Sequence, residues 1–354
     1  MKKAILLPFL WCILLLITGC AKTPTAVNDS GILRGSNSQE QSEMAIAQSQ
    51  TAVSAEALLS SLPPKCEDTV MCANGSNYKF SAAVEGGQPL DITSFSLKEK
   101  TVDTEWLKSI LFGDRASAAV ELEALGYEGQ TYWAITDKKT GNERETLSCF
   151  QYGNISRDEF NYQRENLIYD DDSQSLKVDE SIPSVSDESA VIIAAPIIQR
   201  LGAKGLTVLE GYNYTYEVTF YFLPQFTALP IAPDAEDNTI MRVKATVCNG
   251  EVYELSGASL FLEIAESKNV ENLLPFPTIM DIAKTHLAQI ATKDTPSLTE
   301  ISLRHRYLYD ETLGTVDASL VWYFSIPSSN VEDDFGIGQH TWSFMIDAVT
   351  GLVY

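Results

Sequence analysis

Few side chains in this sequence have the types and spacing needed for nucleophilic or acid–base chemistry. There are three histidines, His286, His305 and His340. His286 is expected on the apolar face of a helix, and His305 stands between two arginines of a strand, where we expect a surface position. No serine or cysteine makes an evident partner for any of them, and Gly-x-Ser-x-Gly, His-Glu-x-x-His, Walker and EF-hand motifs are absent from the sequence. The sequence therefore predicts no enzyme activity, no catalytic residue and no cofactor.

Acidic clusters offer the hard oxygen ligands that calcium prefers. They are Asp170-Asp171-Asp172 and Glu332-Asp333-Asp334. Runs of acids in polar surroundings are also typical of solvated loops, and we favour that interpretation. The sequence therefore predicts no metal site.

Three tyrosines open a stretch with an aromatic or apolar residue at every second position. Tyr212, Tyr214 and Tyr216 are followed by Val218, Phe220 and Phe222. Period two predicts one long, half-buried strand. Two interpretations stay open: the tyrosines form the core face of a sheet, or they form a ligand platform for a sugar or a peptide. We favour the core, because the residues between them are polar.

The first twenty residues carry an export signal and a lipidation motif. Lys2 and Lys3 precede the apolar segment Ala4–Ile17, which is too short for a spanning helix and suits a secretory signal. The segment leads into Leu16-Ile17-Thr18-Gly19-Cys20, which resembles a bacterial lipobox. This resemblance implies that residues 1–19 are a lipoprotein signal peptide and that Cys20 becomes the lipidated first residue. The chain is then attached to the cell membrane through palmitate-type lipid on the extracytoplasmic face.

Four further cysteines follow Cys20 in the exported part. They are Cys66, Cys72, Cys149 and Cys248. In an oxidising compartment they allow three pairings, and Cys66 with Cys72 is a plausible local disulfide. Buried free thiols are the alternative.

The charge excludes one class of function. The chain has 25 Lys and Arg against 48 Asp and Glu, a net charge of −23. Nucleic acid repels a chain with this balance, so no nucleic-acid partner is expected.

Composition divides the chain into four parts. After the signal peptide, residues 20–60 are rich in small polar residues and predict a flexible tether. Residues 61–180 predict an N-terminal α+β region, and residues 185–354 predict a C-terminal α+β region built as a repeat.

Local patterns predict the elements of both regions. Helices are expected from Asp103 to Gly113, from Asp187 to Gly202 and over 278–290, from caps and apolar faces. Hairpins are expected around Gly141 and around Asn249-Gly250. The fold class predicted is α+β, with antiparallel sheets that are each packed by a helix.

The last residues carry a resemblance to a known family. Trp342–Tyr354, with its Asp-Ala-Val-Thr-Gly turn, resembles the closing hairpin of PepSY domains, and Gly-x-Val-Tyr occurs at both Gly250 and Gly351. Asn269–Phe276 resembles the helix entry of uncharacterised Firmicute lipoproteins. The element order is similar to that of the extracytoplasmic YycH and YycI proteins, which restrain a sensor kinase. The resemblance implies a tandem PepSY-like repeat, and it supplies no catalytic residue.

We therefore expect a lipid-anchored, non-catalytic interaction or regulatory module whose partner is another envelope protein. The alternative is a substrate-binding lipoprotein for peptide or glycan.

Overall fold

The computed structural model describes most of the chain after residue 51. The described residues are 52–122, 130–136, 141–151, 159–164, 168–170, 175–177, 187–213, 217–233, 241–248, 250–257, 262–292, 294–310, 313–327, 331–333, 336–338 and 341–354. The signal peptide, Cys20 and most of the expected tether lie outside this part of the chain. Within it, no helix has both the length and the apolar character that crossing a bilayer requires.

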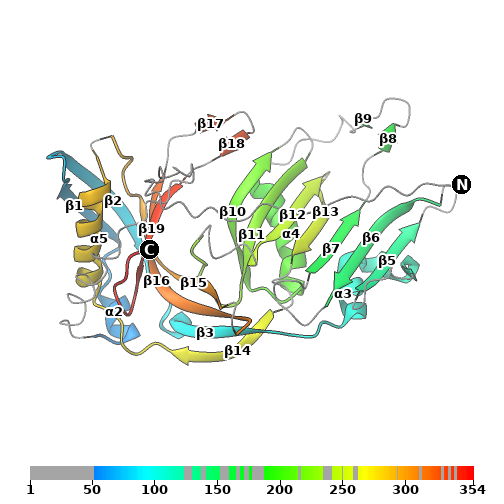
Figure 1. The fold of residues 1–354 in the computed structure, drawn as a ribbon, viewed down its shortest axis with the longest axis horizontal. Helices are drawn as coiled ribbons and strands as arrows, with labels where there is room; N and C mark the ends of the chain where they lie inside the picture. The colour runs from blue at the N-terminus through cyan, green and yellow to red at the C-terminus, as the bar shows by residue number, and fades with distance from the viewer. Residues whose placement is uncertain are drawn as a thin grey trace, which may run out of the picture. The chain divides into compact units, whose positions relative to one another are not determined.

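One sheet is eight-stranded, and each of its strand pairs is antiparallel (Figure 1). In spatial order it contains β10 (Gly205–Asn213), β11 (Glu217–Gln225), β12 (Val243–Cys248), β13 (Glu251–Gly257), β7 (Glu159–Arg164), β6 (Glu143–Phe150), β5 (Gln130–Thr136) and β4 (Val120–Leu122). Helices α3 (Thr104–Phe112) and α4 (Asp187–Arg200) pack on one face. Because Trp133, Leu147, Tyr162 and Leu255 point to that face, their burial creates the core of this sheet.

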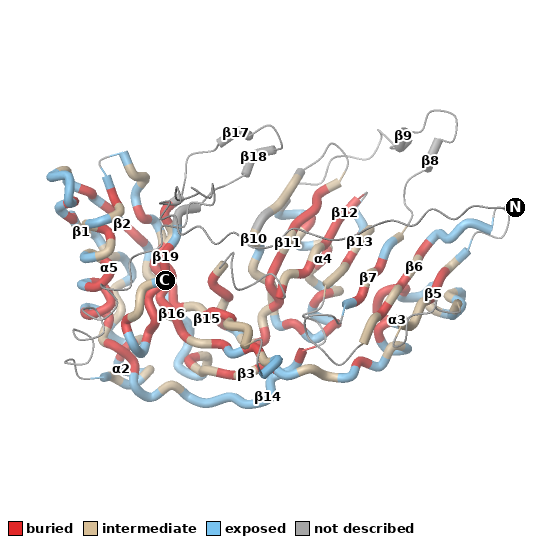
Figure 2. Tube along the Cα trace, in the orientation of Figure 1, coloured by how far each residue is buried: buried red, intermediate tan, exposed pale blue. Residues whose placement is uncertain are grey.

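The other large sheet is seven-stranded and mixed. Its order is β1 (Lys65–Met71), β2 (Asn77–Glu85), β15 (Glu300–Asp310), β16 (Thr315–Pro327), β3 (Thr93–Glu99) and β14 (Leu262–Asn269), with β19 (Thr341–Asp347) also paired to β16. Only β2 and β15 run parallel among these described pairs. Buried and exposed residues alternate along β2, as Figure 2 shows, because one face packs against α5 (Phe276–Ile290).

Four short strands and two short helical turns also belong to the described elements. They are β8 (Ile168–Asp170) with β9 (Ser175–Lys177), β17 (Val331–Asp333) with β18 (Gly336–Gly338), and the 3₁₀ turns η1 (Pro89–Asp91) and η2 (Gly113–Ala118). The predicted fold class, α+β with sheets packed by helices, is confirmed.

The sheets do not follow the sequence division expected at residues 180–185. The eight-stranded sheet takes β4–β7 from one side of that point and β10–β13 from the other, whereas the seven-stranded sheet joins residues 65–99 to residues 262–347. Local patterns cannot reveal this, because strand pairing across long sequence separations depends on which apolar faces meet.

The end of the expected tether belongs to the folded body. Val53 forms a β-bridge with Leu273, and α2 (Ala55–Ser61) buries Leu58 in the core beneath the seven-stranded sheet. Ser54 caps α2 by accepting a hydrogen bond from the N–H of Ala57. The flexible-tether prediction is therefore wrong for residues 53–60.

The expected repeat is visible in the element order. Helix α4 is followed by the β10–β11 hairpin, then β12 and β13. Helix α5 is followed by the β15–β16 hairpin, then β19 and a bridge between Ile346 and Val353. Both units thus place a helix before two strands that pair with each other. Two further strands extend the sheet in the first unit, whereas the second unit adds β19, the single bridge at Val353 and the separate β17 and β18 pair.

We expect Gly351→Val to destabilise the protein by roughly 1–3 kcal/mol. Gly351 has φ of 76°, a left-handed conformation that a β-branched residue resists. The turn is fixed by Asp347, whose Oδ1 accepts the N–H groups of Val349 and Thr350 at 2.9 and 2.7 Å. Denaturant unfolding measures the change, with Val349→Ala, half-exposed in the same turn, as the matched control. An unchanged unfolding midpoint for Gly351→Val is the contrary result.

Candidate functional site

A pocket of about 290 Å³ opens between the two helices and the core face of the eight-stranded sheet. Its apolar wall consists of aliphatic side chains, Leu111, Ile193, Ile197 and Val252. Its polar wall contains Arg115, Tyr162, Arg164 and Glu251, with Gly250 at the β12–β13 turn.

Two caps at the ends of α3 place Arg115 at the pocket. Asp103 begins α3, because its Oδ1 accepts the N–H groups of Glu105 and Trp106 at 3.0 and 3.2 Å. Gly113, with φ of 57°, ends the helix, and Arg115 follows in η2. Both caps confirm the helix limits predicted from the sequence.

Half of the aliphatic lining, Ile193 and Ile197, comes from α4. The helix ends in a Schellman motif, in which Gly202 N–H donates to Gln199 O at 3.0 Å and Ala203 N–H donates to Ile198 O at 3.3 Å. Ala190, Ala194 and Ile198 are buried against the sheet. The helix continues through Pro196, which is exposed, so water can reach the Ile192 carbonyl that proline leaves unpaired.

A buried carboxylate joins the two arginines. Glu145 of β6 has a side chain only 5% exposed, and its Oε1 lies 2.7 Å from Arg115 Nε and 3.1 Å from Arg164 Nε. Glu145 and Arg164 are also directly paired residues of β6 and β7. Arg164 Nη1 forms a second ion pair, with Glu251 Oε2. The buried Glu145 carboxylate thus fixes the orientations of both arginines.

Burial dominates the protonation equilibria of this cluster. It raises the pKa of Glu145, an effect that the positive charges of Arg115 and Arg164 oppose. It also raises the pKa of Tyr162, and the negative charge of Glu145 adds to that rise. The second carboxylate oxygen of Glu145, Oε2, is buried without a hydrogen-bond partner among the described residues.

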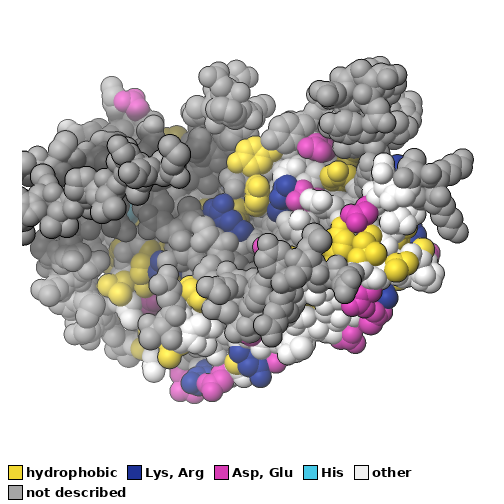
Figure 3. All heavy atoms as spheres, turned by 45° about the vertical axis from the view of Figure 1, so that its right-hand side comes forward, with side chains coloured by type: hydrophobic (Ala, Val, Ile, Leu, Met, Phe, Trp, Pro, Cys, Tyr) yellow, Lys and Arg dark blue, Asp and Glu magenta, His cyan; other side chains and the backbone are white. Residues whose placement is uncertain are grey.

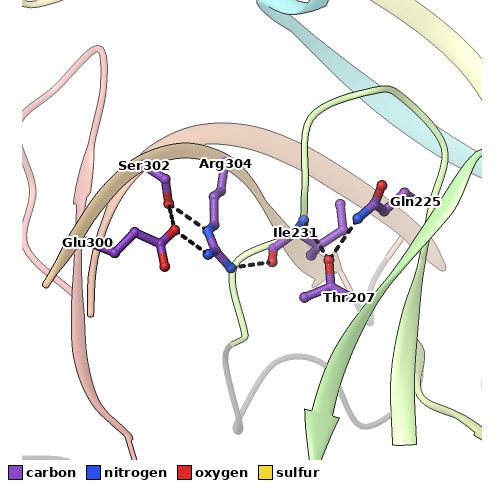
Figure 4. Close-up of polar contacts among 6 residues, drawn as sticks. All are labelled: Thr207, Gln225, Ile231, Glu300, Ser302 and Arg304. Atoms are coloured by element: carbon purple, nitrogen blue, oxygen red, sulfur yellow. Dashed lines mark hydrogen bonds and ion pairs between the residues drawn. The ribbon is translucent and has the colours of Figure 1, made fainter. Parts of the chain in front are cut away.

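A second polar cluster fastens one sheet to the other (Figure 4). On β15, Arg304 donates to Ser302 Oγ at 2.8 Å and to Glu300 Oε1 at 2.6 Å, and its Nη1 reaches Ile231 O at 3.4 Å. Ile231 N–H in turn donates to Thr207 Oγ1 of β10 at 3.1 Å, and Thr207 also accepts from Gln225. The segment after β11 therefore lies between the two sheets and is hydrogen-bonded to both.

His305 lies in this junction, and the expectation that it is a surface residue was wrong. It is fully buried; its Nε2 is 2.7 Å from Thr93 O and its Nδ1 is 3.1 Å from Thr227 Oγ1. Because a carbonyl only accepts, Nε2 carries the proton and the Thr227 hydroxyl donates to Nδ1. The ring also meets Phe95 edge-on. The arginines on either side of His305 suggested a surface strand. In the structure, Arg304 stacks on the ring of Tyr323 and Arg306 stacks on the ring of Tyr354.

The tyrosine stripe is not one strand. Residues 205–213 and 217–225 are separate, antiparallel strands, and Tyr212 of β10 is paired with Thr219 of β11. Tyr212 therefore shares a face with Thr219 and Tyr221, on the side of the sheet away from α4, whereas Phe220 lies on the core face. Tyr214 and Tyr216 lie outside the described residues. Thr219, one of the polar residues between the aromatic positions, is buried and hydrogen-bonded to Thr246 at 2.9 Å.

The proposed pairing of Cys66 with Cys72 is wrong: neither residue forms a disulfide, and neither do Cys149 and Cys248. Cys66 lies in β1 and Cys72 directly follows it. Six residues of extended strand separate their Cα atoms by about 20 Å, whereas a disulfide needs about 4.4–6.8 Å. The alternative, buried thiols, describes Cys72, Cys149 and Cys248.

The remaining histidines and the acidic clusters form no site among the described residues. His286 lies on α5, its ring centroid is 4.8 Å from that of Phe344, and burial lowers its pKa. The side chains of the two acidic clusters and His340 fall outside what the structure describes. Within the described residues, no group of three or more His, Cys, Asp or Glu side chains is placed to hold a metal ion. On the face in Figure 3, acidic side chains lie beside basic ones.

Sequence patterns did not predict the pocket residues, because these residues are far apart in the chain. One signal was present: Glu145 is in phase with Leu147 and Cys149 on β6. A carboxylate at a core-facing position needs cationic partners, and this requirement points to arginines on the neighbouring elements.

Comparisons with known proteins identify no family. No family model matches the chain, and no curated protein matches it. Among solved structures, it is similar to an uncharacterized protein from Eubacterium rectale ATCC 33656, with 12% identity over 89% of this chain and 98% of that chain and a TM-score of 0.44. It is also similar to the Bacillus megaterium YpeB C-terminal domain, with 17% identity over 72% of this chain and 96% of that chain and a TM-score of 0.40.

Proposed function

We propose that this chain is a lipid-anchored, extracytoplasmic interaction module that binds another protein of the cell envelope and catalyses no reaction. The lipobox at Leu16–Cys20 supports the anchor and the location. The C-terminal unit is proposed to be PepSY-like because of its closing Asp-Ala-Val-Thr-Gly turn, and the resemblance of its element order to that of the YycH and YycI proteins suggests a regulatory role.

The observation that carries the binding role is the pocket with its two pre-oriented arginines. Arg115 and Arg164 converge on Glu145, which fixes their planes before any partner arrives. Preorganised donors beside an apolar wall favour binding, because little side-chain entropy is lost when a partner engages them.

A pull-down from membranes of intact cells tests this role. The bait is the tagged full-length protein, compared with the double variant Arg115→Gln/Arg164→Gln and with Lys268→Gln as the matched control. Because the two arginines neutralise the buried Glu145, circular dichroism and urea unfolding must first show that the double variant is folded. Lys268 lies on β14, with a side chain 75% exposed. We expect one envelope protein to be recovered with the wild type and Lys268→Gln, and at least about tenfold less with the double variant. Equal recovery with all three baits, or none above background, contradicts the proposal.

A substrate-binding lipoprotein for peptide or glycan is the second candidate. The combination of aliphatic side chains with two oriented arginines in one pocket favours it, although the volume of about 290 Å³ is just below the roughly 300–1,000 Å³ typical of small-molecule sites. The two candidates are distinguished by what copurifies with the protein. A peptide or glycan that copurifies when no envelope protein is recovered supports the second candidate.

We expect Cys20→Ala to abolish lipid labelling and to leave the precursor uncleaved, because the thiol is the lipid acceptor and lipidation precedes cleavage. Metabolic labelling with radioactive palmitate and the electrophoretic mobility of the protein measure both effects. Cys12→Ala, within the apolar segment, is the control and retains labelling. Full labelling and membrane retention of Cys20→Ala is the result that refutes the anchor.

A further inference from the structure

We propose that the pocket binds the free carboxyl terminus of a peptide whose last residue is aliphatic. This inference rests on the proposed binding function and names the chemistry of the segment that the partner presents. It follows from three features of the pocket: the number of donors that its two arginines carry, the half-exposed Glu251 carboxylate on Arg164 and the aliphatic side chains of its lining.

The first feature is the supply of hydrogen-bond donors. A guanidinium carries five N–H donors in a planar fork. Glu145 takes the Nε donor of Arg115 and of Arg164, Arg115 also hydrogen-bonds to the Tyr162 side chain, and Nη1 of Arg164 pairs with Glu251. These contacts engage only part of the five donors of each guanidinium, and both arginines line the pocket. A carboxylate is the planar acceptor that matches the remaining edge of a guanidinium, often through two parallel hydrogen bonds.

The second feature is Glu251, which already places a carboxylate on Arg164. The Glu251 side chain is 52% exposed, against 5% for Glu145. Exposed ion pairs contribute little to stability, so Glu251 can be exchanged at low cost. Glu251 is thus an internal substitute for the ligand carboxylate, and Glu145 is a positioning residue that keeps both arginines in place when the exchange occurs.

The third feature selects the rest of the ligand. The apolar part of the lining consists of Leu111, Ile193, Ile197 and Val252, which are all aliphatic. Sugars bind preferentially on aromatic faces, whereas an aliphatic wall suits a leucine, isoleucine or valine side chain. The volume of about 290 Å³ fits one such terminal residue with its carboxylate.

Calorimetric titration of the purified protein tests the proposal with three probes. They are acetyl-Ala-Ala-Leu with a free carboxylate, the same peptide as its C-terminal amide, and free leucine. Loss of a charged hydrogen-bond partner predicts that the amide binds roughly tenfold or more weakly than the acid. Equal binding of acid and amide, no binding of the acid, or tighter binding of free leucine than of the peptide overturns the proposal.

Two variants assign the effect to the pocket. Arg164→Gln is expected to weaken binding of the acid about tenfold or more. Glu251→Gln, a surface change that should not affect folding, is expected to tighten it about two- to fivefold by removing the competing carboxylate. Weaker binding by Glu251→Gln contradicts the exchange. If the pull-down recovers a pocket-dependent partner while acid and amide bind alike, the carboxylate inference fails and the interaction function stands.

Discussion

Replacing Phe220 with alanine is expected to lower the free energy of unfolding by about 3–5 kcal/mol. Phe220 is only 2% exposed and contributes to the core that α4 covers. Its ring also lies 5.7 Å from that of Phe222. Truncation leaves a cavity between the sheet and α4. Urea unfolding followed by circular dichroism measures the effect.

Tyr212→Ala is the matched comparison, since Tyr212 lies on the opposite face of the same hairpin. It makes an edge-on contact with Tyr221, at 6.4 Å between ring centroids. We expect a cost of about 0.5–1.5 kcal/mol. A larger loss for Tyr212→Ala than for Phe220→Ala contradicts the placement of the two residues on opposite faces.

His305→Leu is expected to cost about 2–4 kcal/mol at pH 7, because it leaves the buried carbonyl of Thr93 without its donor and Thr227 without its acceptor. The buried imidazole also makes stability depend on pH. Burial lowers the pKa of His305, while the Thr93 carbonyl and the charge of Asp91 partly oppose this. The unfolded chain therefore binds a proton more readily, so the contribution is complete above the unfolded pKa of about 6.5 and is lost as the pH falls below it.

Urea unfolding of wild type and variant between pH 7.5 and 5 measures this dependence. The wild type should lose stability more steeply than His305→Leu. His286→Leu serves as the control. Burial lowers the pKa of His286 as well, so its contribution to the pH dependence of stability must be measured separately. A pH dependence that His305→Leu leaves unchanged contradicts a buried neutral imidazole at the junction.

Much of the local structure follows from sequence alone. Asp103 and Gly113 bound one helix and Gly202 ends another, because caps act on their own neighbouring backbone groups. The turn at Gly250 likewise has the left-handed backbone that its Asn-Gly signal predicts. These signals depend on a few adjacent residues and survive any tertiary arrangement.

The errors have a common physical cause in long-range pairing. Period two from Tyr212 to Phe222 is equally compatible with one strand and with a hairpin, and only the pairing of Tyr212 with Thr219 separates them. His305 was assigned to the surface because of its arginine neighbours, yet the segment at Ile231 covers it from another part of the chain. The pocket depends on β6, β7 and β13 lying side by side, which no local pattern encodes.

Site-specific photo-crosslinking in living cells tests the central claim, that this chain binds an envelope protein through the pocket, most directly. A photoreactive residue replaces Ile197, which lines the pocket, or Ile192, which is 71% exposed on the same helix. The account predicts that the Ile197 probe forms an adduct with one envelope protein and that Arg115→Gln/Arg164→Gln abolishes it, while the Ile192 probe forms none. Adducts at Ile197 no stronger than those at Ile192, or adducts that persist without the two arginines, contradict it.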